Sequence, residues 1–293
     1  MTWFAFATAS ALLSAAAALL QKKVLFRLTP LEFSFILSAV ILLFSLFVPV
    51  TTDIFSVPAA SMVILLLKSV LGGIAFLCVM HALQKNQISS ALPLLGITPA
   101  AAALLSLPVL GESLRPWEWI GVGLMMAGSY TLELRPNQSL LRPFRHIAST
   151  RSYYYIYAAV ALFAVSSVAD RLLLSGYRIA PPVVLFYQHV VYCAIFGAQL
   201  LLRRRSLRAV FSGGKEYLVP IACIALITLA YRYTQLEATR LASVALVLAV
   251  KRTSILYATV AGGLLFKDER ITIKTVAGIL IVASGFIILR EIG

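Results

Sequence analysis

Two adjacent cationic side chains, Lys251 and Arg252, lie inside a long apolar run of the sequence. No other charged residue occurs between positions 241 and 266, so the pair sits near the middle of a segment with the composition of a membrane-spanning helix. A charge at that depth costs roughly 2.5–3.5 kcal/mol on insertion scales, and it therefore usually faces a polar cavity where it has a function. The pair predicts a cavity that binds a negatively charged group. The alternative is a structural pairing of one cation with a carboxylate or a backbone carbonyl.

Further polar residues in apolar runs are candidates for the same substrate-binding cavity: Gln188, His189, Arg232, Lys68 and Lys23. Each has a structural alternative. A lone histidine is more often a satisfied core group than a ligand, and an arginine between two tyrosines is typical of an interfacial anchor. Asp170 and Arg171, late in another apolar run, either face the cavity or reach the headgroups by snorkelling.

The composition places the chain in a membrane. Apolar residues make up 61% and charged residues 12%, and the mean hydropathy is +0.94. A soluble domain is about 25% charged, so this chain has too little polar surface to cover a globule in water. The net charge of +14 does not indicate nucleic-acid binding, because the Lys and Arg residues fall in short gaps between apolar runs. Three cysteines inside apolar runs predict no disulfide framework.

Ten runs are long enough to span a bilayer core, which needs roughly 20 apolar residues per helix. The sequence therefore predicts an all-α membrane protein with ten transmembrane helices and no soluble domain. The longest connection, residues 136–152, is basic and divides the runs five and five. The predicted spans are 3–20, 31–50, 61–82, 91–110, 117–134, 153–174, 182–202, 217–236, 243–266 and 275–290.

The two halves, 1–135 and 153–293, have the features of copies. Glu112 and Glu269 are each followed by a glycine after nine residues and by a second glycine seven residues later. Upstream, Ser-Ser-Ala91-Leu92 corresponds to Ser-Val-Ala245-Leu246. A helical glycine costs about 1 kcal/mol against alanine, so close helix packing is the predicted use of these glycines, with direct substrate contact as the alternative. They are Gly121, Gly128, Gly278 and Gly285.

Five spans per copy force the second copy to insert upside down, and the charges follow this pattern. The loops on the side of the linker, counted as residues 135–152, carry 16 Lys and Arg residues, against 5 on the other side. Since cationic short loops stay in the cytoplasm, we predict a bacterial inner-membrane protein with the linker in the cytoplasm and both termini outside. The first run has no basic residue before it and is predicted to be a retained helix, not a signal peptide.

These features resemble the drug/metabolite transporter superfamily, specifically its EamA-type ten-helix members. The resemblance is carried by 82–94 with Pro93, by Pro99, by Leu110-Gly111-Glu112, by the Gly121/Gly128 helix and by the second copy that ends in Phe266-Lys267-Asp268-Glu269. It implies a small-metabolite transporter, often for amino acids, with a cavity lined by the first four helices of each half. It also implies that the fifth and tenth helices are structural or lie at a homodimer contact. The second copy departs from the first, because Lys251 and Arg252 stand at the level of the first copy's prolines.

No sequence motif indicates covalent chemistry, a metal or another cofactor. The predicted function is a secondary transporter, with export as the family tendency, for a small metabolite bearing an anionic group such as an amino acid or organic acid. The predicted partners are that substrate and the lipid bilayer. Two alternatives remain: a flippase for a lipid with an anionic headgroup, and a non-transporting membrane scaffold or membrane-embedded enzyme.

Overall fold

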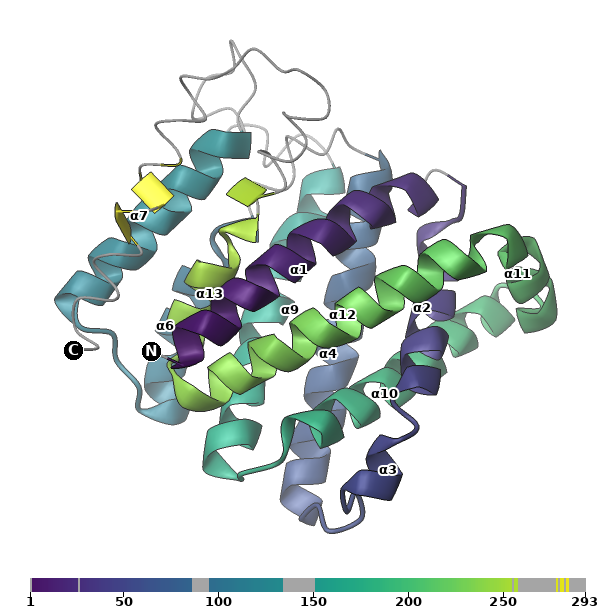
Figure 1. The fold of residues 1–293 in the computed structure, drawn as a ribbon, viewed down its shortest axis with the longest axis horizontal. Helices are drawn as coiled ribbons and strands as arrows, with labels where there is room; N and C mark the ends of the chain where they lie inside the picture. Colours follow the sequence, from purple (N-terminus) through teal and green to yellow (C-terminus); the bar gives the residue numbers. More distant parts are fainter. Residues whose placement is uncertain are drawn as a thin grey trace.

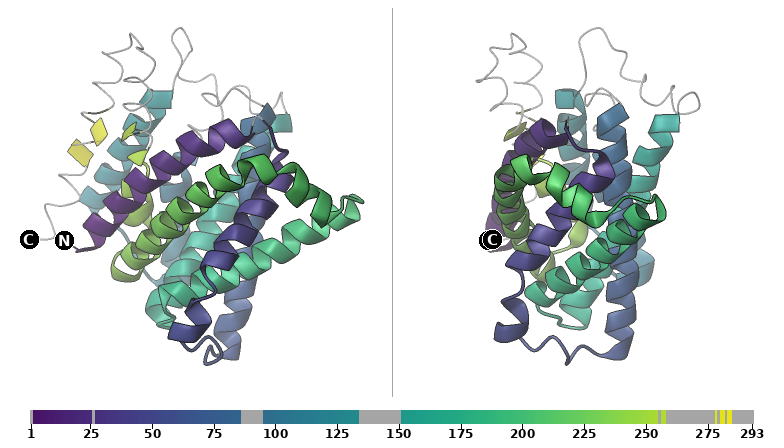
Figure 2. Two further views of the ribbon diagram at one scale, coloured as in Figure 1. Left: turned by 45° about the vertical axis from the view of Figure 1, so that its right-hand side comes forward. Right: turned by 90° about the vertical axis from the view of Figure 1, so that its right-hand side faces the viewer.

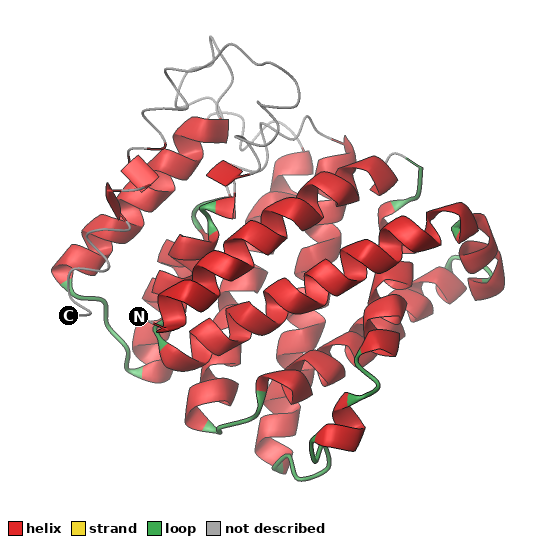
Figure 3. Cartoon of the chain, viewed as in Figure 1, coloured by secondary structure: helices red, strands yellow, loops and turns green. Residues whose placement is uncertain are grey.

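The computed structural model describes residues 2–25, 27–85, 95–133, 151–254, 256–257, 278, 280–281 and 283–284. All regular secondary structure in these ranges is helical (Figure 3). The helices of the first half are α1 (Thr2–Leu25), α2 (Pro30–Phe44), α3 (Val48–Thr51), α4 (Ala59–Lys85), α6 (Thr98–Leu110) and α7 (Pro116–Glu133). Those of the second half are α9 (Arg151–Arg171), a π-helical turn (Leu172–Gly176), α10 (Pro181–Leu202), α11 (Leu207–Gly213), a 3₁₀ turn (Lys215–Tyr217), α12 (Leu218–Leu241) and α13 (Val244–Lys251).

Six of the described helical segments are long and apolar enough to cross a membrane, which makes this a multi-pass membrane protein. They coincide with the first, second, third, sixth, seventh and eighth predicted spans: Thr2–Gln21, Pro30–Thr51, Ala59–His81, Tyr154–Gly176, Pro181–Leu202 and Lys215–Leu241.

Local sequence signals set several helix ends. Thr29 and Glu32 form a capping box at the start of α2, where Pro30 occupies the first helical position. Gly111 ends α6 with φ +67°, a left-handed conformation that residues with a side chain rarely adopt. Figure 2 shows the short α11 beyond the adjacent ends of α10 and α12, which it connects.

The helices contact one another in pairs that match an inverted repeat. α1 lies along α12, and α4 lies along α9 (Figure 1). A two-fold rotation that exchanges the first span (α1) with the sixth (α9) and the third span (α4) with the eighth (α12) converts one of these pairs into the other. The remaining pairs, α2 with α10 and α6 with α13, would map onto themselves. These contacts are compatible with the predicted inverted repeat, and both the repeat and the complete ten-helix arrangement stay predictions.

The fourth and ninth predicted spans are not continuous helices, which corrects the sequence analysis. Residues 96–97 form a turn between helical Leu95 and α6, and residues 252–253 form a turn after α13. Lys251 is therefore the last residue of α13 and Arg252 is its C-cap, rather than the middle of a helix. Discontinuous helices at membrane depth occur where their freed backbone groups line a cavity.

The predicted glycine contacts are described only in part. Gly121 and Gly128 are buried in α7, and their role in helix packing stays a prediction. At Gly278 an added methyl group would lie 3.8 Å from Leu256, an ordinary distance that does not require glycine. Gly285, the 136–150 part of the linker and most of the tenth span lie outside the described residues.

Candidate functional site

A cavity of about 250 Å³ lies between the helices of the two halves. The helices α1, α2, α4, α6, α9, α10, α12 and α13 all contribute to its lining. Much of the wall is apolar, and the polar groups gather on the second half. The polar residues that line it are Ser14, Ser38, Thr98, Ser166, Ser167, Asp170, Gln188, His189, Tyr192, Thr228, Tyr231, Arg232, Gln235, Lys251, Arg252 and Ser254.

A buried ion pair joins α4 to α9 at one end of this cavity. Lys68, only 1% exposed, donates from Nζ to Asp170 Oδ1 at 2.6 Å and to Gln188 Oε1 at 2.8 Å. Asp170 is 3% exposed. Ser166 donates to the Lys68 carbonyl at 3.1 Å, so α4 and α9 are also joined through the backbone. Because an unpaired buried charge is costly, these contacts explain how a lysine is tolerated inside α4.

Arg232 continues the network from α12. Its Nη2 lies 3.5 Å from Asp170 Oδ2 and 3.0 Å from Gln188 Oε1, while its Nη1 donates to Gln235 Oε1 at 3.0 Å. Gln235 Oε1 also accepts a hydrogen bond from Lys251 Nζ at 2.5 Å. The Lys251 ammonium further lies 4.9 Å from the centre of the Tyr231 ring, within the range of a cation–π contact.

The two discontinuous helices meet beside this network. Arg252 Nη2 donates to Thr98 Oγ1 at 3.0 Å, and Thr98 is the first residue of α6. Lys251 and Arg252 end α13, where the helix dipole favours cations. The N-terminus of α6 faces the same region with the opposite dipole, which favours anions. This combination supplies positive potential to the cavity from both halves.

The cavity holds more positive than negative charge. Since Lys251 Nζ and Arg232 Nη1 share Gln235 Oε1, these two nitrogens are at most 5.5 Å apart. At an effective dielectric constant of about 20, two like charges at such a distance repel by roughly 3 kcal/mol. Asp170 is the only carboxylate that lines the cavity among the described residues, and Lys68 contacts it closely. An anion bound beside Lys251 and Arg232 would relieve this repulsion.

His189 lies in the cavity wall, and its hydrogen bond goes to the backbone of its own helix, α10, and not to the charged network. Its Nδ1 lies 2.9 Å from the Leu185 carbonyl oxygen, to which this nitrogen can only donate. The ring packs against Tyr192, with 5.6 Å between ring centres. Within the described ranges, no three His, Cys, Asp or Glu residues are placed to hold a metal ion.

The structure brings together most of the residues singled out in the sequence. Gln188, His189, Arg232, Lys251 and Arg252 all line the cavity. Arg232 is therefore not an interfacial anchor. Lys68 does not line the cavity but lies buried behind it against Asp170 and Gln188. The Lys23 side chain lies outside the described residues.

Sequence reasoning missed two important polar partners, Gln235 and Thr98, and left a third, Asp170, open. Asp170 faces the cavity, an alternative that the sequence analysis left open, and Gln235 and Thr98 were not considered. The signal for Gln235 was its position three residues after Arg232, which places both on one face of a helix. No comparable signal identified Thr98, because its contact with Arg252 spans 154 positions of the chain.

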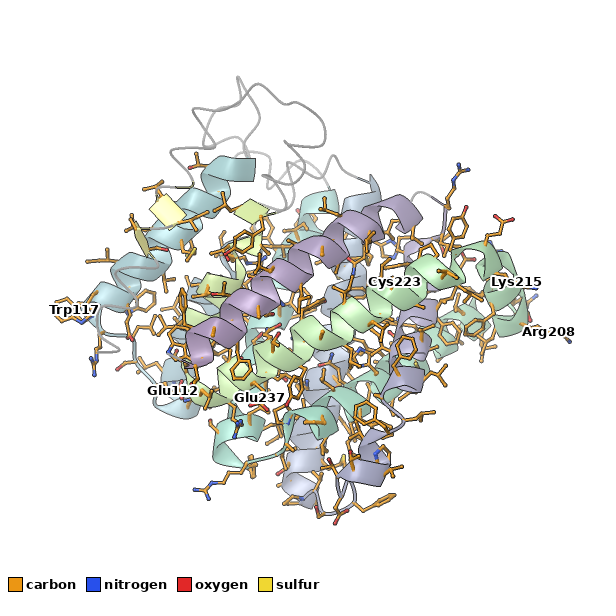
Figure 4. The ribbon with its side chains drawn as sticks, in the orientation of Figure 1. Glu112, Trp117, Arg208, Lys215, Cys223 and Glu237 are labelled. Carbon is orange, nitrogen blue, oxygen red and sulfur yellow. The ribbon has the colours of Figure 1, made fainter. Side chains whose placement is uncertain are left out.

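A second polar cluster ties the two halves together near the ends of α6, α9 and α12. Arg171 Nε donates to Glu112 Oε1 at 2.8 Å and so joins α9 to the segment that follows α6. Arg171 Nη1 donates to the carbonyls of Thr239 and Arg240 at 2.8 and 2.9 Å. Glu112 and Glu237 lie in this region of the molecule (Figure 4). Because Arg171 directly follows Asp170, the cluster adjoins one end of the cavity.

Comparison with known proteins is consistent with this arrangement. A solved structure titled "Crystal structure of protein" superimposes with a TM-score of 0.76 at 16% identity, covering 99% of this chain and 96% of that chain. At this identity the likeness shows the fold alone. No curated protein matches the sequence. Residues 1–133 match the family model described as the EamA-like transporter family. Residues 1–133 are thus similar to a family of membrane transporters, and helices that can cross a bilayer with a polar cavity between them agree with this likeness.

Proposed function

We propose that the protein is a secondary transporter for a small metabolite bearing an anionic group, such as an amino acid or an organic acid. The observation that carries the proposal is the cationic lining of the cavity, above all Lys251 and Arg232 around one neutral amide oxygen. A carboxylate can accept hydrogen bonds from both cations, and such charge-assisted bonds are about twice as strong as neutral ones.

The size of the cavity favours a metabolite over a macromolecule. A volume of about 250 Å³ lies near the lower limit of small-molecule sites, which begin at about 300 Å³. The apolar part of the wall, from residues such as Leu37, Phe76 and Phe163, would contact the uncharged part of the substrate.

Alternating access is the mechanism that we propose for transport. The cavity lies between elements of both halves, so rocking one half against the other would expose it to each side in turn. The Arg171–Glu112 pair joins the halves near one end of the cavity and would have to break when that end opens. Without a nucleotide-binding motif, the energy would come from a gradient, and export is the direction that we propose.

Reconstitution into proteoliposomes tests this function. The purified protein would be assayed for uptake of labelled amino acids and organic acids, with Lys251→Gln and Arg252→Gln as site variants. Losing one charge-assisted contact costs about 1.5–3 kcal/mol, so each variant is expected to bind or transport the substrate roughly ten- to a hundred-fold less well. Lys215→Gln is the matched control, because Lys215 is exposed beside α11 and does not line the cavity (Figure 4).

Two results would contradict the proposal. Normal transport by both site variants would show that the two cations are structural. Movement of a fluorescent anionic lipid between leaflets, with no uptake of any soluble anion, would favour the flippase alternative.

A further inference from the structure

Three cations of the site are linked through neutral oxygens. Gln188 Oε1 accepts hydrogen bonds from Lys68 and Arg232, and Gln235 Oε1 accepts from Arg232 and Lys251. An amide oxygen carries only a partial negative charge, so neither glutamine neutralises the cations that it joins. The series has a carboxylate, Asp170, only at the Lys68 end.

The two ends of this series therefore differ in charge. At one end the Lys68 ammonium lies 2.6 Å from Asp170, so these two charges compensate each other. At the other end Arg232 and Lys251 converge on Gln235 Oε1, and Arg232 reaches Asp170 only at 3.5 Å. Arg252 adds a further positive charge next to Lys251 in the wall of the same cavity. Among the described residues, Asp170 is the only carboxylate that lines the cavity, so a ligand with one negative charge would leave this end net cationic.

We infer that the substrate carries two negative charges and that its anionic oxygens bind between Lys251 and Arg232 in place of the Gln235 amide oxygen. This inference rests on the proposed transport function and specifies the charge of its substrate. Gln235 Oε1 marks the position that such an oxygen would take, since it lies 2.5 Å from Lys251 Nζ and 3.0 Å from Arg232 Nη1. The Gln235 side chain would release both cations when the ligand enters.

Two ligand chemistries satisfy this charge requirement: a dicarboxylate and a phosphate monoester. Both present several acceptor oxygens to Lys251 and Arg232. A dicarboxylate would distribute its charges along the cavity, whereas a phosphate monoester would concentrate them at Gln235. The test below therefore includes both chemistries.

The test compares ligands that differ in one charge. The thermal stability of the purified full-length protein is measured with succinate, with its monoamide succinamate, and with glycerol phosphate, at neutral pH and constant ionic strength. We expect succinate or glycerol phosphate to stabilise the protein at concentrations about ten-fold or more below those needed for succinamate, as expected for one additional charge-assisted contact. The same ligands are then compared as inhibitors of transport in proteoliposomes.

Two variants at Gln235 make the assignment specific. Gln235→Glu puts a fixed carboxylate between Lys251 and Arg232 with little change in shape, so it should abolish the preference for divalent anions. Gln235→Met removes the amide without adding charge, and its preference for divalent over monovalent anions should stay within about two-fold of the parent protein, since the same charge-assisted contacts remain. Melting curves without ligand verify that both variants are folded.

The outcomes separate this inference from the proposed function. If succinamate stabilises the protein as well as or better than both succinate and glycerol phosphate, the divalent charge requirement is overturned. Transport of a monovalent anion then stays in place. A preference for divalent anions that survives in Gln235→Glu overturns the placement at Gln235. Absence of binding and transport for every anion, monovalent or divalent, counts against both the proposed function and this inference.

Discussion

Replacing Asp170 by asparagine should destabilise the protein, because this carboxylate is the close anionic partner of Lys68. The Lys68 ammonium is almost fully buried and lies 2.6 Å from Asp170 Oδ1. After Asp170→Asn it would keep the neutral acceptor Gln188 at 2.8 Å but lose its counter-ion. Breaking a buried pair by removing one partner costs about 3–5 kcal/mol. We expect the lower part of this range, since an asparagine carbonyl can still accept a hydrogen bond.

A double-mutant cycle isolates this interaction. Lys68→Met should cost less than Asp170→Asn, because Asp170 would still have Arg232 at 3.5 Å. The double variant should be more stable than the sum of the two single effects predicts, by about 1–3 kcal/mol. The measurement is equilibrium unfolding of the detergent-solubilised protein, with Lys215→Gln as a control for loss of an exposed charge. Additive single effects, or an Asp170→Asn variant as stable as the parent, would refute the reasoning.

Three further predictions concern the contact between the halves, the helix packing and the orientation. Glu112→Gln should weaken the 2.8 Å contact with Arg171 and so open the cavity more often on the Glu112 side. The measurement is the rate at which a thiol reagent added on that side modifies a cysteine introduced at Ser38, which lines the cavity, in a background without native cysteines. This rate should rise, and an unchanged rate would exclude a gating role. Gly72→Leu should cost about 1–3 kcal/mol of stability by overpacking, since a Cβ there would lie 2.6 Å from Tyr192 Oη, whereas Gly123→Leu, with nothing within 4 Å of its Cβ, should be near neutral in the same melting assay. A phosphatase that is active only in the periplasm should be active when fused after residue 293, because the linker side carries 16 Lys and Arg residues against 5 on the other side; fluorescence from a fusion that folds only in the cytoplasm would reverse the orientation.

The long helices and several cavity residues could be predicted from the sequence because each depends on a local signal. Apolar runs of about 20 residues identify spans without any knowledge of their neighbours. An isolated charge in such a run, as at Lys251 or Arg232, is costly enough to indicate a polar surrounding. These signals do not identify the partner, so the sequence favoured an interfacial position for Arg232.

The polar network could not be predicted because its contacts join distant parts of the chain. Lys68 is 102 positions from Asp170 and 120 from Gln188. Lys68 was expected in the cavity, whereas the pair with Asp170 holds it behind the cavity wall. The breaks at 96–97 and 252–253 were also missed, because each lies inside a run that is apolar enough for a continuous helix. Helix breaks at membrane depth are tolerated beside a cavity, which the sequence does not show.

The contact between Arg252 and Thr98 connects the repeat to the proposed function. Aligning Ala91 with Ala245 shifts the numbering by 154 and so pairs Thr98 with Arg252, which are in hydrogen-bond contact. Residues on a two-fold axis contact their own counterparts, so this contact lies where an inverted repeat would have its axis. The two halves contribute different groups there, a hydroxyl at a helix N-terminus from one and a guanidinium at a helix C-terminus from the other. An anion bound at this point would contact both halves at once. Any rocking of the halves must then change its coordination, and this couples binding to the change in access.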